Sequence, residues 1–310
     1  MKKILGTILG LTLFCIALYV LMREIQRYGW SDIVQNLRNI DSAHLAVSMM
    51  FSTLCYLALT GYDTLAWKHF GHRLAYLRIA KASFVGYAFS HNLGFSLLTG
   101  APVKYRIYSA WGIRAVDVAK VVAFTGFSLA IGFSTLMGLA LILEPQTIAT
   151  QLKLPVAGAR PYGMLLVAAV ATYLALSAFI KKPIRIKKLH ISIPAPHIRA
   201  GQVIVSCSEW MFAAATLYVL FVPGLSIPYT AFLAIFISAY VAGFISQVPG
   251  GLGVFDTIVL ISLKPIAPLP TIMAALLAYR VVYYIIPLIC ALALLGVHEL
   301  FHRKNRPASA

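Results

Sequence analysis

Charged side chains inside apolar stretches are the residues of this sequence with the most distinctive chemistry. Three of the nine acidic residues stand in such stretches: Asp63 in GYDTLAW, Glu209 in SEWMF and Asp256 in PGGLGVFD. Arg280 stands in the equally apolar AYRVVYYIIP. An ionised side chain at the centre of a membrane-spanning helix costs about 2.5–3.5 kcal/mol, so such residues generally mark a substrate, ion or proton site.

The balance of these charges separates two interpretations. Arg280 could be neutralised by Asp256 or Glu209 and only hold helices together. Three embedded carboxylates, however, outnumber one deeply embedded arginine. A surplus of negative charge would attract a cationic group or hold protons. With Arg106, which follows an interrupted apolar segment, these residues are the predicted substrate-binding set.

A proline and a run of glycines before Asp256 predict a broken helix. Pro249 removes a backbone donor, and Gly250, Gly251 and Gly253 loosen the helix and allow close approach to the backbone. In a bilayer, non-helical backbone is tolerated only where it is buried in protein or faces a watery cavity. The break therefore predicts a site.

A second apolar segment, residues 82–103, is interrupted in the same way, by Gly94, Gly100 and Pro102 among others. Four basic residues follow it, and they would lie outside if the segment crossed the membrane fully. The charge bias disappears if the segment enters from the cytoplasm and turns back. We therefore expect the glycines and prolines of both broken segments to form hairpin and gating elements.

The composition is that of an all-α, polytopic membrane protein. Of 310 residues, 60% are hydrophobic and 11% charged, and the mean hydropathy is +0.84. There is no appreciable soluble domain to hold an ordinary active site. The net charge of +17 comes from short clusters between apolar runs, which indicates positive-inside topology and contact with anionic lipid instead of nucleic acid.

The apolar runs predict about six full spans, at 4–22, 44–67, 120–143, 162–180, 201–222 and 270–298. Basic loops at 68–81 and 181–199 and a basic C-terminus place both termini in the cytoplasm. Residues 228–268 must then begin and end outside. The thirteen residues 251–263 after the break reach only about 20 Å, so they are too short to cross a ~30 Å hydrocarbon core.

Two oppositely oriented re-entrant hairpins thus accompany the full spans. Paired broken segments in two halves of a chain are typical of an inverted-repeat transporter with its site near the midplane. The expected organisation is a single transmembrane domain over residues 1–305 and a polar cytoplasmic tail at 306–310.

Other motifs are weaker indications of a function. Ser90, His91 and Asn92 lack a nearby acid and are more typical of a polar hairpin tip than of nucleophilic catalysis. PGGLG lacks the GK[ST] of a phosphate-binding loop, although its backbone amides could still meet a phosphate. The cysteines and histidines show no metal-ligand spacing, so we predict no metal site and no cofactor.

Five motifs in order give a resemblance to a known family. GYDTLAW, APVKYRIYSAWG, the intramembrane Glu209, PGGLGVFD and AYRVVYYIIP resemble the transmembrane region of lysylphosphatidylglycerol synthases, also called multiple peptide resistance factors. The resemblance covers about residues 1–305. It implies that Asp63, Arg106, Glu209 and Asp256 are important for the function of the family. We add Arg280 because it also stands deep inside an apolar stretch.

The resemblance also implies a function. In that family the transmembrane region is expected to flip aminoacylated phosphatidylglycerol to the outer leaflet, which masks negative surface charge against antimicrobial peptides. Full-length members continue into further helices and an aminoacyl-transferase domain, whereas this sequence ends at Ala310. We therefore expect no synthase activity, and a separate lipid aminoacyl-transferase and a homodimer are partners that the resemblance suggests.

These observations predict a phospholipid translocase of the bacterial inner membrane. Two other classes stay open. A secondary transporter of a small organic cation would need its acidic cavity closed off from the bilayer. A non-transporting subunit of a lipid-modifying system would show all four embedded charges tightly paired.

Overall fold

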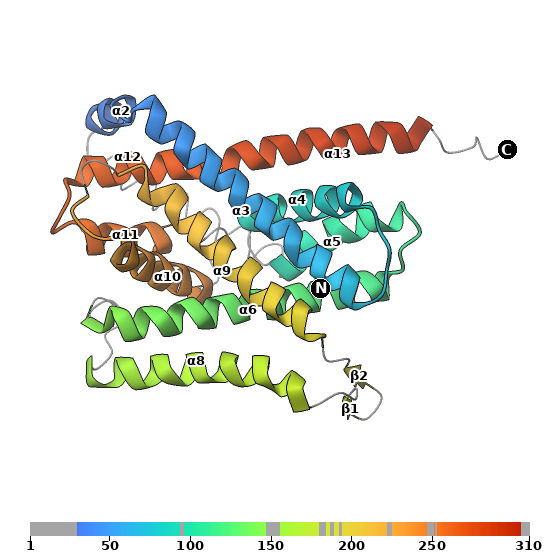
Figure 1. Ribbon diagram of the computed structural model, residues 1–310. Coiled ribbons are helices and arrows are strands. Elements are labelled where there is room, and N and C mark those ends of the chain that lie inside the picture. Colours follow the sequence, from blue (N-terminus) through green and yellow to red (C-terminus); the bar gives the residue numbers. More distant parts are fainter. Residues whose placement is uncertain are drawn as a thin grey trace, which may run out of the picture.

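The computed structural model describes residues 30–93, 96–146, 156–179, 184–186, 189–191, 194–221, 225–246, 251 and 253–304. It is an elongated helical bundle, as predicted (Figure 1). Its elements are α2 (Trp30–Arg38), α3 (Ser42–His69), α4 (Tyr76–Leu93), α5 (Ser96–Ser109), α6 (Ala115–Leu143), α8 (Val156–Phe179), β1 (Ile184–Ile186), β2 (Leu189–Ile191), α9 (Pro196–Tyr218), α10 (Tyr229–Ser246), α11 (Val254–Leu263), α12 (Leu269–Tyr279), the π-helix η2 (Arg280–Ile285) and α13 (Ile286–Lys304).

Three long apolar helices extend through the bundle. Ser42–His69, Ala115–Leu143 and Leu269–Val297 are each long and apolar enough to cross a membrane. Ala159–Ala175, Tyr229–Gly243 and Val254–Leu263 are shorter apolar helices. The predicted first span, residues 4–22, lies outside the described residues.

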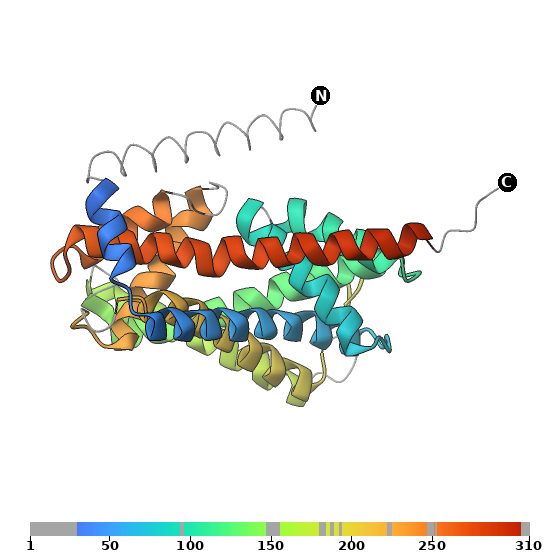
Figure 2. The same ribbon diagram turned by 90° about the horizontal axis from the view of Figure 1, so that it is seen from above.

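The last of these helices is one rod with an unusual middle. α12 continues through η2 into α13 without a break in direction (Figure 2). A π-helix widens the backbone turn, and such segments are frequent at functional sites. The rod therefore carries a local irregularity at Arg280, where the sequence predicted an embedded charge.

The two interrupted segments form helical pairs at opposite ends of the bundle. α4 and α5 pack together, as do α10 and α11. Figure 1 shows the α4–α5 pair at the end where β1 and β2 lie and the α10–α11 pair at the other end. Each pair occupies only part of the length of α3, which is the arrangement expected of two hairpins that enter from opposite sides.

The basic stretch 181–199 is more structured than a loop. Its strands β1 and β2 pair antiparallel, with Arg185 opposite His190. α9 begins at Pro196, five residues before the predicted span, because proline is well suited to the first turn of a helix. Arg199 therefore lies in a helix and not in a solvated loop.

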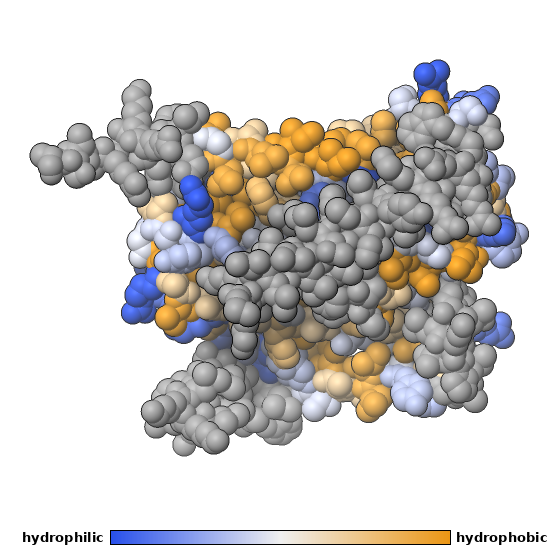
Figure 3. All heavy atoms as spheres, turned by 180° about the vertical axis from the view of Figure 1, so that it is seen from behind, coloured by the Kyte–Doolittle hydropathy of each residue, from blue (hydrophilic) through white to orange (hydrophobic). Residues whose placement is uncertain are grey.

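Exposed apolar side chains form the outer surface. Leu57, Phe127 and Ile261 are each more than half exposed. In the view from behind, apolar residues gather along the middle of the described surface, and hydrophilic residues lie at its two ends (Figure 3). Such a band would be a liability in water and is the surface that a bilayer covers.

Small residues and hydroxyl groups hold the helices close together. Gly132 of α6 faces Ser206 of α9 so closely that a Cβ would overlap it. Ser48 Oγ donates to the carbonyl oxygen of Thr216 at 2.7 Å, and Ser83 Oγ donates to that of Leu59 at 3.1 Å. Close approach and interhelical hydrogen bonds are the usual means of association where lipid removes the hydrophobic driving force.

Substitution of Gly132 tests this packing. Gly132→Ala should lower the free energy of unfolding by about 1–3 kcal/mol, because the added methyl group overlaps Ser206. Gly126→Ala on the same helix is the matched control, since nothing lies within 4 Å of its added Cβ. Thermal denaturation of the purified full chain measures both; equal melting temperatures for the two variants would contradict the packing account.

Candidate functional site: a buried carboxylate beside a lipid-facing groove

Asp63 is neutralised by a lysine from the first hairpin. Lys104 Nζ of α5 lies 2.7 Å from Asp63 Oδ1 of α3, and Tyr108 Oη donates to Asp63 Oδ2 at 3.1 Å. Both charged side chains are buried, at 0% and 4% exposure. Lys104 Nζ also lies 3.8 Å from the centroid of the Tyr87 ring. The sequence analysis counted Lys104 among the basic residues that follow the hairpin and did not predict that it is buried.

Gly86 explains how Lys104 reaches this position. A Cβ on Gly86 would stand within 2.8 Å of two side-chain carbons of Lys104. The absence of a side chain on α4 therefore leaves a passage for the lysine stem toward α3. Gly100 brings the same two helices together, because a Cβ there would lie 2.9 Å from the carbonyl oxygen of Gly86.

Asp256 and Arg280 pair with each other. This agrees with the interpretation that Arg280 is neutralised by one of the embedded carboxylates. Arg280 Nη2 donates to Asp256 Oδ2 at 2.8 Å, and the backbone N–H of Gly253 donates to the same oxygen at 3.0 Å. Gly253 has φ +80° and Gly251 has φ +62°, which is backbone that glycine adopts without strain. The ion pair thus joins the start of α11, after the break, to the π-helix η2.

Glu209 is the embedded carboxylate that remains. It is 4% exposed, in the middle of α9. Tyr62 Oη donates to Glu209 Oε2 at 3.4 Å, and Cys55 Sγ lies 4.0 Å from Oε1. Among the residues that the structure describes, no lysine, arginine or histidine nitrogen lies within 4.0 Å of this carboxylate. Of the three carboxylates that the sequence singled out, Glu209 is therefore the one without a basic partner in the described part of the chain, and it can bind a cationic group or hold a proton.

An aromatic cluster lies beside Glu209. We define it as Tyr56, His91, Tyr279 and Tyr283. The rings of His91 and Tyr283 stack with centroids 5.4 Å apart, and those of Tyr279 and Tyr283 stack at 5.1 Å. Tyr283 Oη is 3.4 Å from Cys55 Sγ, which connects the cluster to the Glu209 surroundings. Aromatic faces together with a carboxylate are the groups that bind organic cations.

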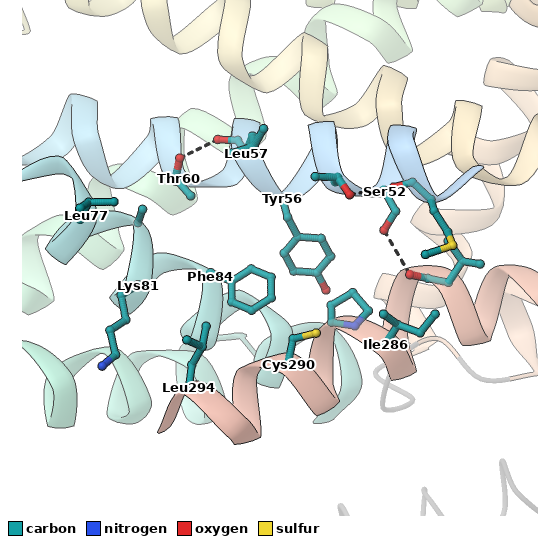
Figure 4. Close-up of a pocket in the computed structure, with 15 residues that line it drawn as sticks. Ser52, Tyr56, Leu57, Thr60, Leu77, Lys81, Phe84, Ile286, Cys290 and Leu294 are labelled. Carbon is teal, nitrogen blue, oxygen red and sulfur yellow. Dashed lines mark hydrogen bonds between the residues drawn. The ribbon is translucent and has the colours of Figure 1, made fainter. Parts of the chain in front are cut away.

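An apolar groove lies on the other side of Tyr56 (Figure 4). It has a volume of about 480 Å³ and runs between α3, α4 and the η2–α13 rod. Its lining includes Tyr56, Thr60, Ala80, Lys81, Phe84 and Cys290. Lys81 lies at one end and Ile286 at the other (Figure 4). The groove has the apolar lining that an acyl chain requires, with one cation at its end.

Tyr56 separates the groove from the carboxylate. Its ring lines the groove, and its Oη donates to the carbonyl oxygen of Tyr283 at 3.2 Å. Cys55, the preceding residue, faces Glu209. Two consecutive residues of α3 thus face the groove and the buried acid. Both contact Tyr283, so a movement of the η2–α13 rod would change the surroundings of the groove and of Glu209.

The other predicted site residues are more dispersed. Arg106 is exposed on α5, and Pro102 is exposed within the same helix. Gly94, Pro249 and Gly250 lie outside the described residues. Asn92, taken as part of a polar tip, donates to the carbonyl oxygen of Tyr284 at 3.1 Å and so ties α4 to the π-helix.

These features define a class: an all-α, polytopic membrane protein with ionisable groups buried among its helices. Residues 7–291 match the family model described as the lysylphosphatidylglycerol synthase transmembrane region, and the chain belongs to that family. The resemblance found in the sequence motifs is thereby confirmed.

The relatives are of two kinds. The chain is 34% identical to the uncharacterized protein slr0712 of Synechocystis sp., over 98% of this chain and 95% of that protein. It is 29% identical to the inner membrane protein YbhN of Escherichia coli, over 96% and 94%. It is 28% identical to a phosphatidylglycerol lysyltransferase of Staphylococcus xylosus, over 94% of this chain but only 34% of that protein.

The Asp63–Lys104 pair generates a stability prediction. Asp63→Asn should cost about 3–5 kcal/mol of folding free energy, because it leaves the Lys104 ammonium buried without a carboxylate. Lys104→Met added to Asp63→Asn should recover much of that loss, since the unpaired charge is gone. Thermal denaturation of the full chain measures both.

Asp117→Asn is the control for this pair. The partners of Asp117, Arg114 and Lys120, are 78% and 50% exposed, so its ion pairs are screened and their loss should be much smaller. An Asp63→Asn variant as stable as Asp117→Asn, or a double variant less stable than Asp63→Asn, would contradict the buried pairing.

Proposed function

We propose that the protein is a phospholipid translocase that binds a lipid with a cationic head group, such as an aminoacylated phosphatidylglycerol. The observation that carries the proposal is Glu209, a buried carboxylate with no basic partner among the described residues, beside an apolar groove. Membership of the family supports the lipid class, because relatives of that family are named as phosphatidylglycerol lysyltransferases.

In the proposed complex an acyl chain lies in the groove between α3 and the η2–α13 rod. The amine of the head group binds Glu209 and the faces of the aromatic cluster. Lys81, at the end of the groove, would meet the phosphate. The head group reaches Glu209 when Tyr56 and Tyr283 move, and the irregular backbone of η2 is the element best suited to permit that movement.

Two observations favour this proposal over its rivals. The groove is lined mainly by apolar side chains, among them the exposed Leu57 and Leu77, which suits the acyl chain of a lipid better than a small organic cation. A non-transporting subunit would have its embedded charges tightly paired, and Glu209 is not paired within the described part of the chain. Neither observation calls for a catalytic step, so we propose transport in place of lipid synthesis.

The location follows from the same reasoning. We propose a bacterial inner membrane, as the printed name of the Escherichia coli relative states for that protein. The basic stretches at 68–81 and 181–199 favour a cytoplasmic position for the end of the bundle that carries β1 and β2, and hence for both termini. A separately encoded lipid aminoacyl-transferase and a second copy of the chain are the proposed partners.

Removal of the charge at Glu209 tests the function. Glu209→Gln keeps the shape of the side chain and should lower transport by roughly 10²-fold, because a charge-assisted hydrogen bond to the amine is worth up to about 3 kcal/mol. The measurement is the exposure of lysyl-phosphatidylglycerol in the outer leaflet of vesicles that contain the purified chain.

The matched control is Glu144→Gln at the end of α6, where Thr230 donates to the carboxylate at the surface. It should transport at the wild-type rate. A folded Glu209→Gln protein that exposes the lipid as fast as wild type would remove the basis for the proposal.

Filling the groove gives an independent test. Ala80→Trp places a large ring among the lining side chains and should slow transport severalfold without loss of folding, because the acyl chain loses its place. Val116→Trp, at an exposed position on α6, adds the same ring outside the groove and is the control. If both variants transport alike in the vesicle assay, the groove is not the lipid path.

A further inference from the structure

A second buried charge has no counter-ion among the described residues, and it lies on the same helix as Glu209. Arg199 of α9 is 1% exposed. Its Nη1 donates to the carbonyl oxygen of Tyr173 at 2.9 Å, and its Cζ lies 5.6 Å from the centroid of the Tyr173 ring. Its Nε and Nη2 donors have no hydrogen-bond partner among the described residues. No carboxylate in that part of the chain lies within salt-bridge distance of it.

The polar groups around Arg199 are already engaged with one another. Tyr173 Oη donates to Gln202 Oε1 at 2.6 Å, and Gln202 Nε2 donates to Ser128 Oγ at 2.7 Å. This chain joins α6, α8 and α9, and none of its side-chain oxygens accepts from Arg199. A buried donor without a partner is destabilising, and a charged one more so. Two donors of one guanidinium without partners in the described part of the chain therefore point to an anion as their ligand.

The depth of Arg199 identifies the kind of anion. α9 has 23 residues and extends about 35 Å, slightly more than the ~30 Å hydrocarbon core. Arg199 is in its first turn, which places the guanidinium near the level of the lipid head groups. The helix start is itself positive, and the stretch 181–199 contains six lysines and arginines and no acid.

The shape of the Arg199 guanidinium indicates that the anion is a phosphate. The guanidinium presents parallel N–H donors as a planar fork, and Nε with Nη2 is the edge that is free. This fork matches two oxygens of one phosphate. α8 packs chiefly on α6 and only lightly on α9, so a small separation of α8 from α9 would expose the free edge.

We propose that Arg199 is the core of a binding site for a phosphate group, between α8 and α9, at the end of the bundle that carries β1 and β2. Its ligand is the phosphate of an anionic phospholipid or a free phosphate of the same chemistry. The site is separate from Glu209, which is ten residues along α9, about 15 Å away. It does not require that the protein move lipid.

The experiment measures retention of phosphatidylglycerol by the full chain in detergent, by native mass spectrometry. Arg199→Gln should bind one phosphatidylglycerol roughly tenfold more weakly than wild type, because it loses a charge-assisted fork. Arg160→Gln, at an exposed position near the start of α8, is the matched control and should bind as wild type. Diacylglycerol, which lacks phosphate, should not distinguish the three proteins.

Inorganic phosphate separates the two sources of the ligand. If it displaces phosphatidylglycerol from wild type but has no effect on Arg199→Gln, the site takes phosphate in general; if it displaces nothing, the site takes the lipid. Both results support the proposal. Equal binding of phosphatidylglycerol and of inorganic phosphate by folded wild-type and Arg199→Gln proteins would overturn it and leave the guanidinium as a link between α8 and α9.

A second variant, Arg199→Lys, tests the proposal if Arg199→Gln does not fold. Arg199→Lys keeps the charge but loses the fork, so phosphatidylglycerol should raise its melting temperature less than that of wild type; an equal rise would overturn the proposal. Glu209→Gln should keep the Arg199-dependent binding in full. Wild-type transport in that variant with binding intact would overturn the proposed function and leave the Arg199 site standing, whereas loss of transport together with equal binding by wild type and Arg199→Gln would overturn only the Arg199 site.

Discussion

Neutralisation of charge inside an apolar bundle is the constraint on which this structure depends. Two of the three embedded carboxylates that the sequence singled out have basic partners, Asp63 with Lys104 at 2.7 Å and Asp256 with Arg280 at 2.8 Å. Each pair joins a helix hairpin to a long helix, so the pairs also fix the positions of both hairpins. An isolated charge in such surroundings would be costly, which makes Glu209 and Arg199 informative, because neither has a counter-ion among the described residues.

Those two groups give α9 a polarity along its length. Arg199 is in the first turn and Glu209 in the middle of the helix. The proposed ligands are a cationic amine at Glu209 and, at a separate site, a phosphate at Arg199. The groove between α3 and α13 adds an apolar surface for its acyl chain. Under the two proposals, lipid ligands account for three features that packing alone leaves unexplained.

The overall fold was largely predictable from the sequence. Apolar runs and the positions of basic clusters gave an all-α membrane protein and two interrupted hairpins at opposite ends, because lipid permits few alternatives. The π-helix was not predicted, since RVVYYI contains no residue that distinguishes it from α-helix. Arg199 was assigned to a loop, although Pro196 was a signal for an earlier helix start.

The sequence indicated which charged residues stand in apolar segments and that Asp256 could pair with Arg280, but not that Asp63 pairs with Lys104. Residue types identified Asp63, Glu209, Asp256 and Arg280, whereas the burial of Lys104 depends on the missing side chain of Gly86, a contact between two helices. Tyr56, Tyr283 and His91 come together from three helices and left no local pattern. Only the three-dimensional arrangement shows that Glu209 is the embedded carboxylate without a basic partner among the described residues.

The most direct test of the central claim is the equilibrium binding of lysyl-phosphatidylglycerol and of unmodified phosphatidylglycerol to the purified chain in nanodiscs. If Glu209 provides the charge that a cationic head group neutralises, wild type should bind the lysyl lipid roughly tenfold or more tightly, and Glu209→Gln should bind both lipids alike. Equal affinity of the wild-type protein for the two lipids would contradict the account.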